Sequence, residues 1–254
     1  MKIIRNESMR LYHDLSWLWP IISHHEDYIE EGEFFIRLIK EYGAEGVKTI
    51  LNLGSGGGAL DWVLKSEFNI TGIDVSLPMM TLAQKLNPEV EYIPEDMRSV
   101  RLNRKFNAVI LHDAVAHMET LEELRAAFLT AYEHLERGGL LITFAEEWAE
   151  HFIQNRTEVK NHKKDNIELT YIENNYDPDP SDSTYECTFV YLIRREGFLD
   201  IQTDRMALGI FPLKTWSETL REVGFEVVQL QSPLANIADG LANESYPVFI
   251  GIKT

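Results

Sequence analysis

The stretch Asn52-Leu-Gly-Ser-Gly-Gly-Gly58 follows an apolar run and leads into a helical pattern. Glycine lets the backbone bend sharply and come close to a bound molecule. An acidic residue, Asp74, stands at the predicted end of the next strand, where a carboxylate can accept hydrogen bonds from both hydroxyls of a ribose. The glycine-rich stretch and Asp74 together predict an adenosine-containing ligand.

The glycine spacing fits two such ligands equally well. Gly54-x-Gly56-x-x-Ala59 matches a dinucleotide fingerprint, whereas Gly54-x-Gly56-x-Gly58 matches a loop that binds S-adenosylmethionine. The rest of the chain must therefore decide between them.

The composition of the chain excludes several classes of binding partner and site. The chain has 254 residues, enough for one α/β domain with a modest insertion. Its 24 Lys and Arg against 41 Asp and Glu give a net charge of -17, which repels nucleic acid and anionic membranes. The single cysteine, Cys187, excludes an intramolecular disulfide and a thiolate zinc cluster. Because the N-terminus also lacks an apolar signal core, we expect a soluble, cytoplasmic protein.

Strands and helices alternate in the first two thirds of the chain. Strands are expected at residues 49–53, 69–74, 90–93, 106–111 and 140–144, and helices at 27–42, 58–65, 78–86 and 121–135. This alternation predicts a mainly parallel sheet with right-handed crossovers, on which ligands bind at the carboxyl ends of the strands.

The pattern changes after residue 147. Three antiparallel strands are expected at 168–176, 185–194 and 199–205, followed by a helix at 213–223 and strands at 225–230 and 248–253. The last two strands predict a closing antiparallel hairpin, where a dinucleotide domain would instead continue with parallel strands.

Six segments resemble, in order and spacing, the class I S-adenosylmethionine-dependent methyltransferases. They are residues 49–58, 72–76, 95–97, 106–112, 137–142 and 224–227. The inserted strands, followed by residues 208–213 and Trp216, are also similar to bacterial small-molecule N-methyltransferases, including those that act on amino sugars.

The resemblance implies a fold and a division of the chain. The fold is an α/β, Rossmann-like, mainly parallel seven-stranded sheet with a C-terminal antiparallel hairpin, an inserted antiparallel sheet and an N-terminal helical lid. A single domain, 1–254, would comprise the lid (1–45), the cofactor-binding core (46–147), the inserted sheet (148–210) and a return to the core sheet (211–254).

The resemblance also implies S-adenosylmethionine as cofactor and S-adenosylhomocysteine as product. Gly54, Ser55 and Gly56 would line the methionine half, and Asp74 would bind the ribose. The other implied contacts are Val75, Met79, Asp96 and Met97 at the adenine, Asn52, Tyr28 and His112 at the methionine end, and Tyr12 of the lid beside the sulfonium. Core packing is the alternative for Met79 and Met97. Asn52 departs from the family, which usually has an acid at this position.

The segment after residue 111 follows a strand at the expected ligand edge and carries His112, Asp113 and His117. A neutral histidine there could take a proton from the methyl acceptor. His117 is the first candidate for this base and His112 the second, with a structural or cofactor-packing role as the alternative for each. Candidates for acceptor contacts are Trp17, Glu146, Glu147, Arg205, Phe211 and Trp216. Adjacent His24 and His25 point in different directions, so no metal site is expected.

The sequence therefore predicts an S-adenosylmethionine-dependent methyltransferase acting on a small molecule, with an amine nitrogen as the favoured acceptor. The alternatives are a small-molecule O-methyltransferase, a nicotinamide-dependent oxidoreductase and a non-catalytic S-adenosylmethionine-binding protein. Nucleic acid and membrane are not expected partners, and a homodimer is left open.

Overall fold

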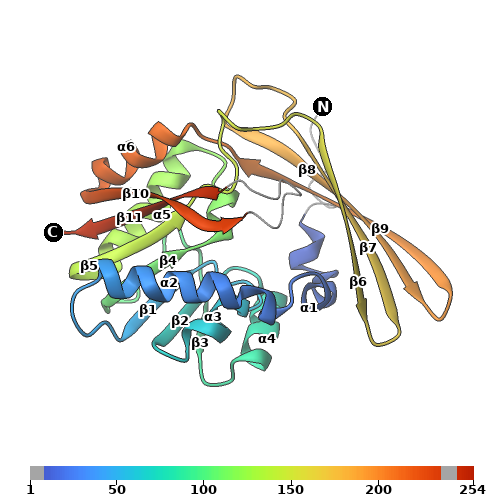
Figure 1. The fold of residues 1–254 in the computed structure, drawn as a ribbon, viewed down its shortest axis with the longest axis horizontal. Helices are drawn as coiled ribbons and strands as arrows, with labels where there is room; N and C mark the ends of the chain where they lie inside the picture. The colour runs from blue at the N-terminus through green and yellow to red at the C-terminus, as the bar shows by residue number, and fades with distance from the viewer. Residues whose placement is uncertain (1–8, 236–244) are drawn as a thin grey trace.

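The structure, a computed structural model, describes residues 9–235 and 245–254. It contains a seven-stranded sheet in the order β10-β11-β5-β4-β1-β2-β3 and a four-stranded sheet in the order β6-β7-β8-β9 (Figure 1). Residues 1–8 of the expected lid lie outside the described residues.

The centre of the larger sheet is parallel. It consists of β1 (Thr49–Leu53), β2 (Asn69–Asp74), β3 (Glu91–Pro94), β4 (Phe106–Leu111) and β5 (Leu135–Phe144). β11 (Ser245–Lys253) pairs antiparallel with both β5 and β10 (Phe225–Ala235). This arrangement confirms the predicted parallel sheet and its antiparallel closing hairpin.

Helices cover both faces of this sheet. Phe35 of α2 (Ile29–Tyr42) and Leu64 of α3 (Ala59–Leu64) belong to the apolar core on one face. Phe128 of α5 (Leu121–His134) and Trp216 of α6 (Leu213–Val223) belong to the core on the other. Burial on both faces explains why most residues of β1 and β4 are apolar. No helix in the described ranges has the length and apolar character needed to cross a membrane.

Local signals in the sequence set the helix boundaries. The Ser76 side chain accepts from the backbone N–H of Met79 at the start of α4 (Leu77–Leu86), where Pro78 stands in the first turn. The Thr120 side chain accepts from Glu123 N–H at the start of α5. Gly224, with φ of 119°, ends α6 as expected.

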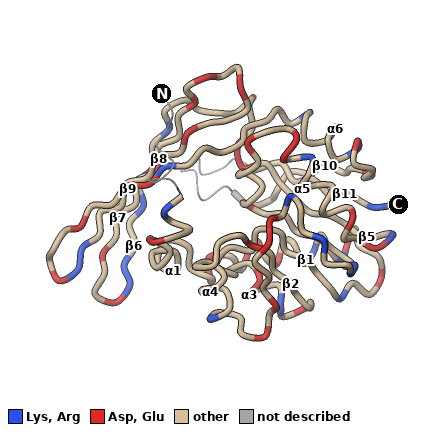
Figure 2. Tube along the Cα trace, turned by 180° about the vertical axis from the view of Figure 1, so that it is seen from behind, with Lys and Arg blue, Asp and Glu red and all other residues tan. Residues whose placement is uncertain are grey.

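The smaller sheet is the predicted insertion, with one more strand than the sequence indicated. β7 (Ile167–Tyr176), β8 (Thr184–Arg195) and β9 (Phe198–Gly209) are each longer than expected. β6 (Arg156–Lys164) is an edge strand that was not predicted. It consists almost entirely of polar residues and none of its side chains is fully buried, so it lacks the alternation of apolar residues that marks a strand. Basic and acidic positions are interspersed at the hairpin tips of this sheet (Figure 2).

Short helical turns fill the N-terminal segment, residues 9–28. They are η1 (Arg10–Tyr12), η2 (Ser16–Leu18), α1 (Trp19–Ile22) and η3 (His25–Tyr28), and the helix expected at 27–42 begins after them, at Ile29. Leu11 and Leu18 share an apolar cluster with the smaller sheet, where Asp204 also accepts from Leu11 N–H at 2.8 Å. The Ser76 hydroxyl, on the larger sheet's side, donates to the Tyr12 carbonyl. The segment thus connects the two sheets.

The loop after β1 is closely packed at Gly58. This glycine has φ of 76°, and a Cβ there would lie 2.7 Å from both Asn87 Nδ2 and Tyr92 Oη. Gly138 has φ of 80° but open space around it. Gly58→Ala should therefore lower the free energy of unfolding by about 2–4 kcal/mol, because strain and overpacking add, and Gly138→Ala by only about 1–2 kcal/mol. Urea unfolding measures both, and equal losses would contradict the close packing at Gly58.

Candidate functional site

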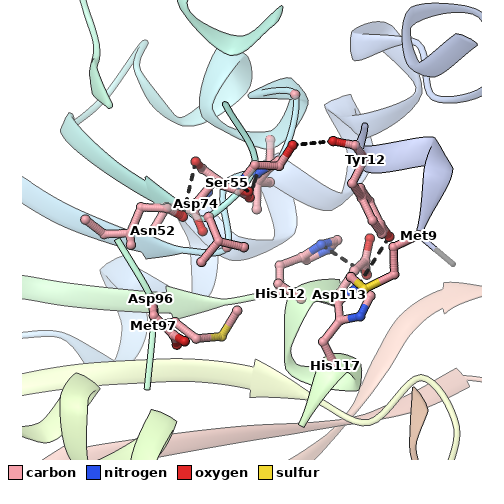
Figure 3. Close-up of a pocket in the computed structure, with 18 of the residues that line it drawn as sticks. Met9, Tyr12, Asn52, Ser55, Asp74, Asp96, Met97, His112, Asp113 and His117 are labelled. Carbon is pink, nitrogen blue, oxygen red and sulfur yellow. Dashed lines mark hydrogen bonds and ion pairs between the residues drawn. The ribbon is translucent and has the colours of Figure 1, made fainter. Parts of the chain in front are cut away.

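A cavity of about 320 Å³ opens at the carboxyl ends of β1, β2 and β4 (Figure 3). Its volume is in the range of small-molecule sites. Most of the predicted cofactor residues and the first-choice base line it: Tyr12, Tyr28, Asn52, Gly54, Ser55, Gly56, Asp74, Val75, Asp96, Met97, His112 and His117. Residues predicted from separate segments of the chain thus line one cavity, and the structure shows how each side chain is held.

The glycine loop and Asp74 form one unit. Gly54 and Gly56 have φ of 78° and 53°, a region that glycine adopts without strain. Gly56 N–H donates to Asp74 Oδ2 at 2.7 Å, and Ser76 N–H donates to Asp74 Oδ1 at 2.8 Å. Burial raises the pKa of the Asp74 carboxyl, and these backbone donors act in the opposite direction. A fixed carboxylate and the loop backbone beside it therefore line the same cavity.

Asn52 is tied to a buried acid that the sequence analysis missed. Asn52 is only 2% exposed, and its Nδ2 donates to Asp61 Oδ1 at 2.7 Å. Burial raises the pKa of Asp61, in α3, to about 6. In the sequence, Asp61 looks like any acid in the first turn of a helix, so no signal could have singled it out.

The side chains at the predicted adenine end are held differently from one another. Val75 is 67% exposed and lines the cavity. Asp96 also lines it, but Arg98 donates to both Asp96 carboxylate oxygens through Nε at 3.0 and 3.1 Å, which lowers the pKa of Asp96. Met79 is fully buried and does not line the cavity, so its expected contact with adenine is corrected to a packing role beneath the loop.

Tyr12 and His117 are in contact with each other in the wall of the first cavity. The Tyr12 hydroxyl lies 3.3 Å from His117 Nε2, and the two rings meet edge to face at 5.3 Å. Burial lowers the pKa of His117 to about 4, so the imidazole is neutral in the physiological range. The neutral form is the one that can accept a proton.

His112 is in the opposite charge state. Its Nε2 lies 2.9 Å from Glu31 Oε2 and its Nδ1 lies 3.1 Å from Asp113 Oδ1. Burial alone would lower the pKa of His112, but the two carboxylates outweigh it and hold that pKa well above the usual value. An imidazolium has no free lone pair, so the expectation of His112 as a base is corrected. The sequence analysis missed Glu31, which stands among other acids in an amphipathic helix.

A second cavity of about 300 Å³ adjoins the first and shares Tyr28, His112 and Asp113 with it. Charged side chains on its wall are mostly acidic: Asp27, Glu30, Glu31, Asp113 and Glu146, beside Lys160 and the cationic ring of His112. Of the residues predicted to contact the acceptor, Glu146 is therefore the one that lines this second cavity.

The other expected acceptor contacts are corrected. Phe211 and Trp216 belong to the apolar core, where the Trp216 ring stacks on Phe249 at 5.8 Å. Arg195 lies over the Trp17 ring at 4.3 Å, and Arg205 pairs with Glu186 at 3.4 Å. Glu147 pairs with Arg156. None of these candidates lines either cavity. Their aromatic or charged character alone could not separate a core or sheet position from a site.

The described residues also include no group of three or more His, Cys, Asp or Glu side chains placed to hold a metal ion. This finding covers residues 9–235 and 245–254.

Comparison with known proteins gives the class of this fold and site. Residues 50–139 match the model of a methyltransferase domain. The chain is 33% identical over 133 residues to the dTDP-3-amino-3,4,6-trideoxy-alpha-D-glucopyranose N,N-dimethyltransferase of Streptomyces venezuelae, an alignment of 48% of this chain and 56% of that protein. The chain thus spans little more than half the length of this curated relative.

Solved structures share the fold over nearly the whole chain. The crystal structure of Streptomyces venezuelae DesVI matches with a TM-score of 0.81 and 22% identity, over 96% of this chain and 97% of that one. S-adenosylmethionine-bound CalS10, an amino pentose methyltransferase from Micromonospora echinaspora, matches with a TM-score of 0.78 and 19% identity, over 89% and 92%.

Residues 50–139 therefore form a methyltransferase domain, and the fold of nearly the whole chain is that of solved structures from the class of S-adenosylmethionine-dependent methyltransferases. In sequence over about half of its length, and in fold, the chain is similar to bacterial amino-sugar N-methyltransferases. The cofactor of this class is S-adenosylmethionine, and an observation of this structure fits it: the carboxylate of Asp74 is fixed beside the Gly54–Gly56 loop, and both line the same cavity.

The two histidines should be distinguishable by their protonation. In ¹⁵N NMR spectra of histidine-labelled protein at neutral pH, His112 should show two protonated ring nitrogens, because Glu31 and Asp113 hold its charge. His117 should show one, and should gain its second proton only as the pH falls toward about 4. Signals from Glu31→Gln and His117→Gln variants assign the two rings. A neutral His112 would contradict the charge states described here.

Proposed function

We propose that the protein transfers a methyl group from S-adenosylmethionine to the nitrogen of a small amine. The observation that carries the proposal is the acid-lined second cavity, which meets the first cavity at Tyr28, His112 and Asp113. The first cavity would hold the methyl donor and the second the acceptor.

The residues of the first cavity would hold the donor through the contacts expected from the sequence. Asp74 would bind the ribose, the backbone of Gly54–Gly56 would lie along the methionine half, and Val75 would cover the adenine. Tyr12 would offer its ring to the sulfonium, an attraction of about 0.5–2 kcal/mol. When bound, S-adenosylmethionine supplies an electrophilic methyl group. The protein's contribution is to align this group with the acceptor and exclude water.

Charge in the second cavity favours an amine over an alcohol. Five carboxylates line its wall against two cationic groups, Lys160 and His112, so the wall is acidic on balance in the described residues. An amine is cationic in neutral water, so this wall would raise its local concentration, whereas a neutral hydroxyl would gain nothing from the field. The same wall disfavours acceptors that carry phosphate groups near the reacting atom.

The nucleophile needs a free lone pair, so the ammonium must first lose a proton. We propose His117 as the base that receives this proton, since its ring is held neutral beside Tyr12. A ring with a pKa of about 4 is a weak base, but it is always in its basic form at neutral pH. His112 would instead keep Glu31 and Asp113 in place at the junction of the cavities.

An oxygen acceptor remains the second candidate within the class. A non-catalytic protein that only binds the cofactor is disfavoured because it would need no second cavity beside the first. A nicotinamide-dependent oxidoreductase is disfavoured by β11, which lies antiparallel between β10 and β5 where a dinucleotide domain continues with parallel strands.

Matched acceptors test the choice of atom. The protein should transfer isotopically labelled methyl from S-adenosylmethionine to amino sugars and simple amines, and not to the corresponding sugars with hydroxyl in place of the amino group. Mass spectrometry of the products measures the transfer. Both a free amino sugar and its nucleotide-linked form should be offered, because the acidic wall favours the free form. Label on the hydroxyl compounds alone would replace the amine by the oxygen acceptor.

The base is tested by His117→Ala. Turnover should fall about 100-fold or more, because general-base catalysis contributes about 10²–10⁴-fold, while affinity for S-adenosylhomocysteine stays close to that of the wild type. His162→Ala is the matched control, since His162 lies on β6 and lines neither cavity. Unchanged turnover in His117→Ala would end this assignment.

A further inference from the structure

We propose that Asp61 is a positioning residue for the cofactor: it turns the Asn52 amide oxygen toward the ammonium group of the methionine end and supplies the negative charge behind it. This inference rests on the proposed use of S-adenosylmethionine, and it concerns the donor rather than the acceptor.

The orientation of the Asn52 amide follows from its hydrogen bonds. Nδ2 donates to Asp61 Oδ1 at 2.7 Å, so this end of the amide faces α3. The other end, Oδ1, is buried and accepts from no group in the described residues. Because Asn52 also lines the first cavity, its unsatisfied oxygen is an acceptor for a donor that enters there. An ammonium group is such a donor.

Asp61 cannot reach solvent and has a second partner. It is 0% exposed, and its Oδ2 accepts from the Tyr92 hydroxyl at 3.0 Å. Asp74 and His112 are the other charged groups that act on it, with opposite effects: Asp74 raises its pKa and His112 lowers it. A carboxylate held here by two donors projects negative charge toward the methionine end through a polarised amide.

The same network supports the glycine loop. Asn87 Nδ2 donates to the Gly58 carbonyl at 2.8 Å and lies 2.9 Å from the Tyr92 hydroxyl. Asp61, Tyr92 and Asn87 therefore link α3, β3 and the end of α4 to the loop after β1. A test must separate the charge of Asp61 from this support.

The arrangement accounts for the departure at position 52. Where the resembled family usually has an acid on the strand, this chain has an amide on the strand and an acid on the following helix, nine residues later. The negative charge is kept, but it stands on Asp61 and acts on the ligand through the hydrogen bond that Asn52 donates to it. Exchanging the two residue types should therefore preserve function.

Calorimetric titration with two ligands at mildly alkaline pH separates the charge of Asp61 from its support of the glycine loop. S-adenosylhomocysteine carries the amino-acid end, and 5′-methylthioadenosine lacks it. Asp61→Asn should weaken S-adenosylhomocysteine binding by at least about tenfold, since the hydrogen bond from Asn52 loses its charged acceptor and the negative charge behind the amide is removed. Methylthioadenosine affinity should stay within about twofold. The double variant Asn52→Asp/Asp61→Asn should recover affinity to within about threefold of the wild type.

Tyr92→Phe is the matched control, because it removes one hydrogen bond to Asp61 and keeps the carboxylate; its loss of S-adenosylhomocysteine affinity should be smaller than that of Asp61→Asn. The proposal is overturned if Asp61→Asn binds S-adenosylhomocysteine as the wild type does, if it loses both ligands alike, or if the exchanged pair does not recover. A wild type that binds neither ligand would instead refute the proposed use of the cofactor.

Discussion

The hydrogen bond from Gly56 N–H to Asp74 holds the site together. It fixes the loop after β1 to the end of β2, and with Ser76 N–H it leaves the Asp74 carboxylate in a single orientation. Gly54 N–H and Ser55 N–H also donate to the Ile73 carbonyl, at 2.7 and 2.9 Å. The loop backbone that lines the cavity is thus an extension of the sheet's own hydrogen bonding. A loop held in this way loses less conformational freedom when a ligand binds, which lowers the entropic cost of binding.

Charge is distributed around this rigid loop in separate compartments. His112, which precedes η4 (Asp113–His117), is cationic between two carboxylates, whereas His117, the last residue of η4, is neutral against Tyr12. The two rings therefore differ in environment more than in position along the chain. Proximity to a strand end predicted that both would matter, but only the three-dimensional neighbours Glu31, Asp113 and Tyr12 determine what each can do.

Sequence reasoning was accurate where a residue's role depends on its own stretch of chain. The glycine loop, Asp74 and the alternation of apolar residues are local signals, and they predicted the larger sheet, its closing hairpin and most of the cavity wall. It was inaccurate where the role depends on a distant partner. Trp216 reads as an aromatic site residue until Phe249 is found stacked on it, and Asp61 reads as a helix-start acid until Asn52 is found bonded to it. β6 was missed for the related reason that an edge strand needs no apolar alternation.

The N-terminal segment, residues 9–22, belongs both to the core of the smaller sheet and to the first cavity. Its leucines complete the core of the smaller sheet, while Tyr12 and Trp19 form the wall of the first cavity. The smaller sheet is consequently not an exchangeable module. A chimaera that grafts residues 148–210 from a relative would pack poorly against this segment unless residues 9–22 were exchanged as well, so an exchange of the smaller sheet would also alter the wall of the first cavity.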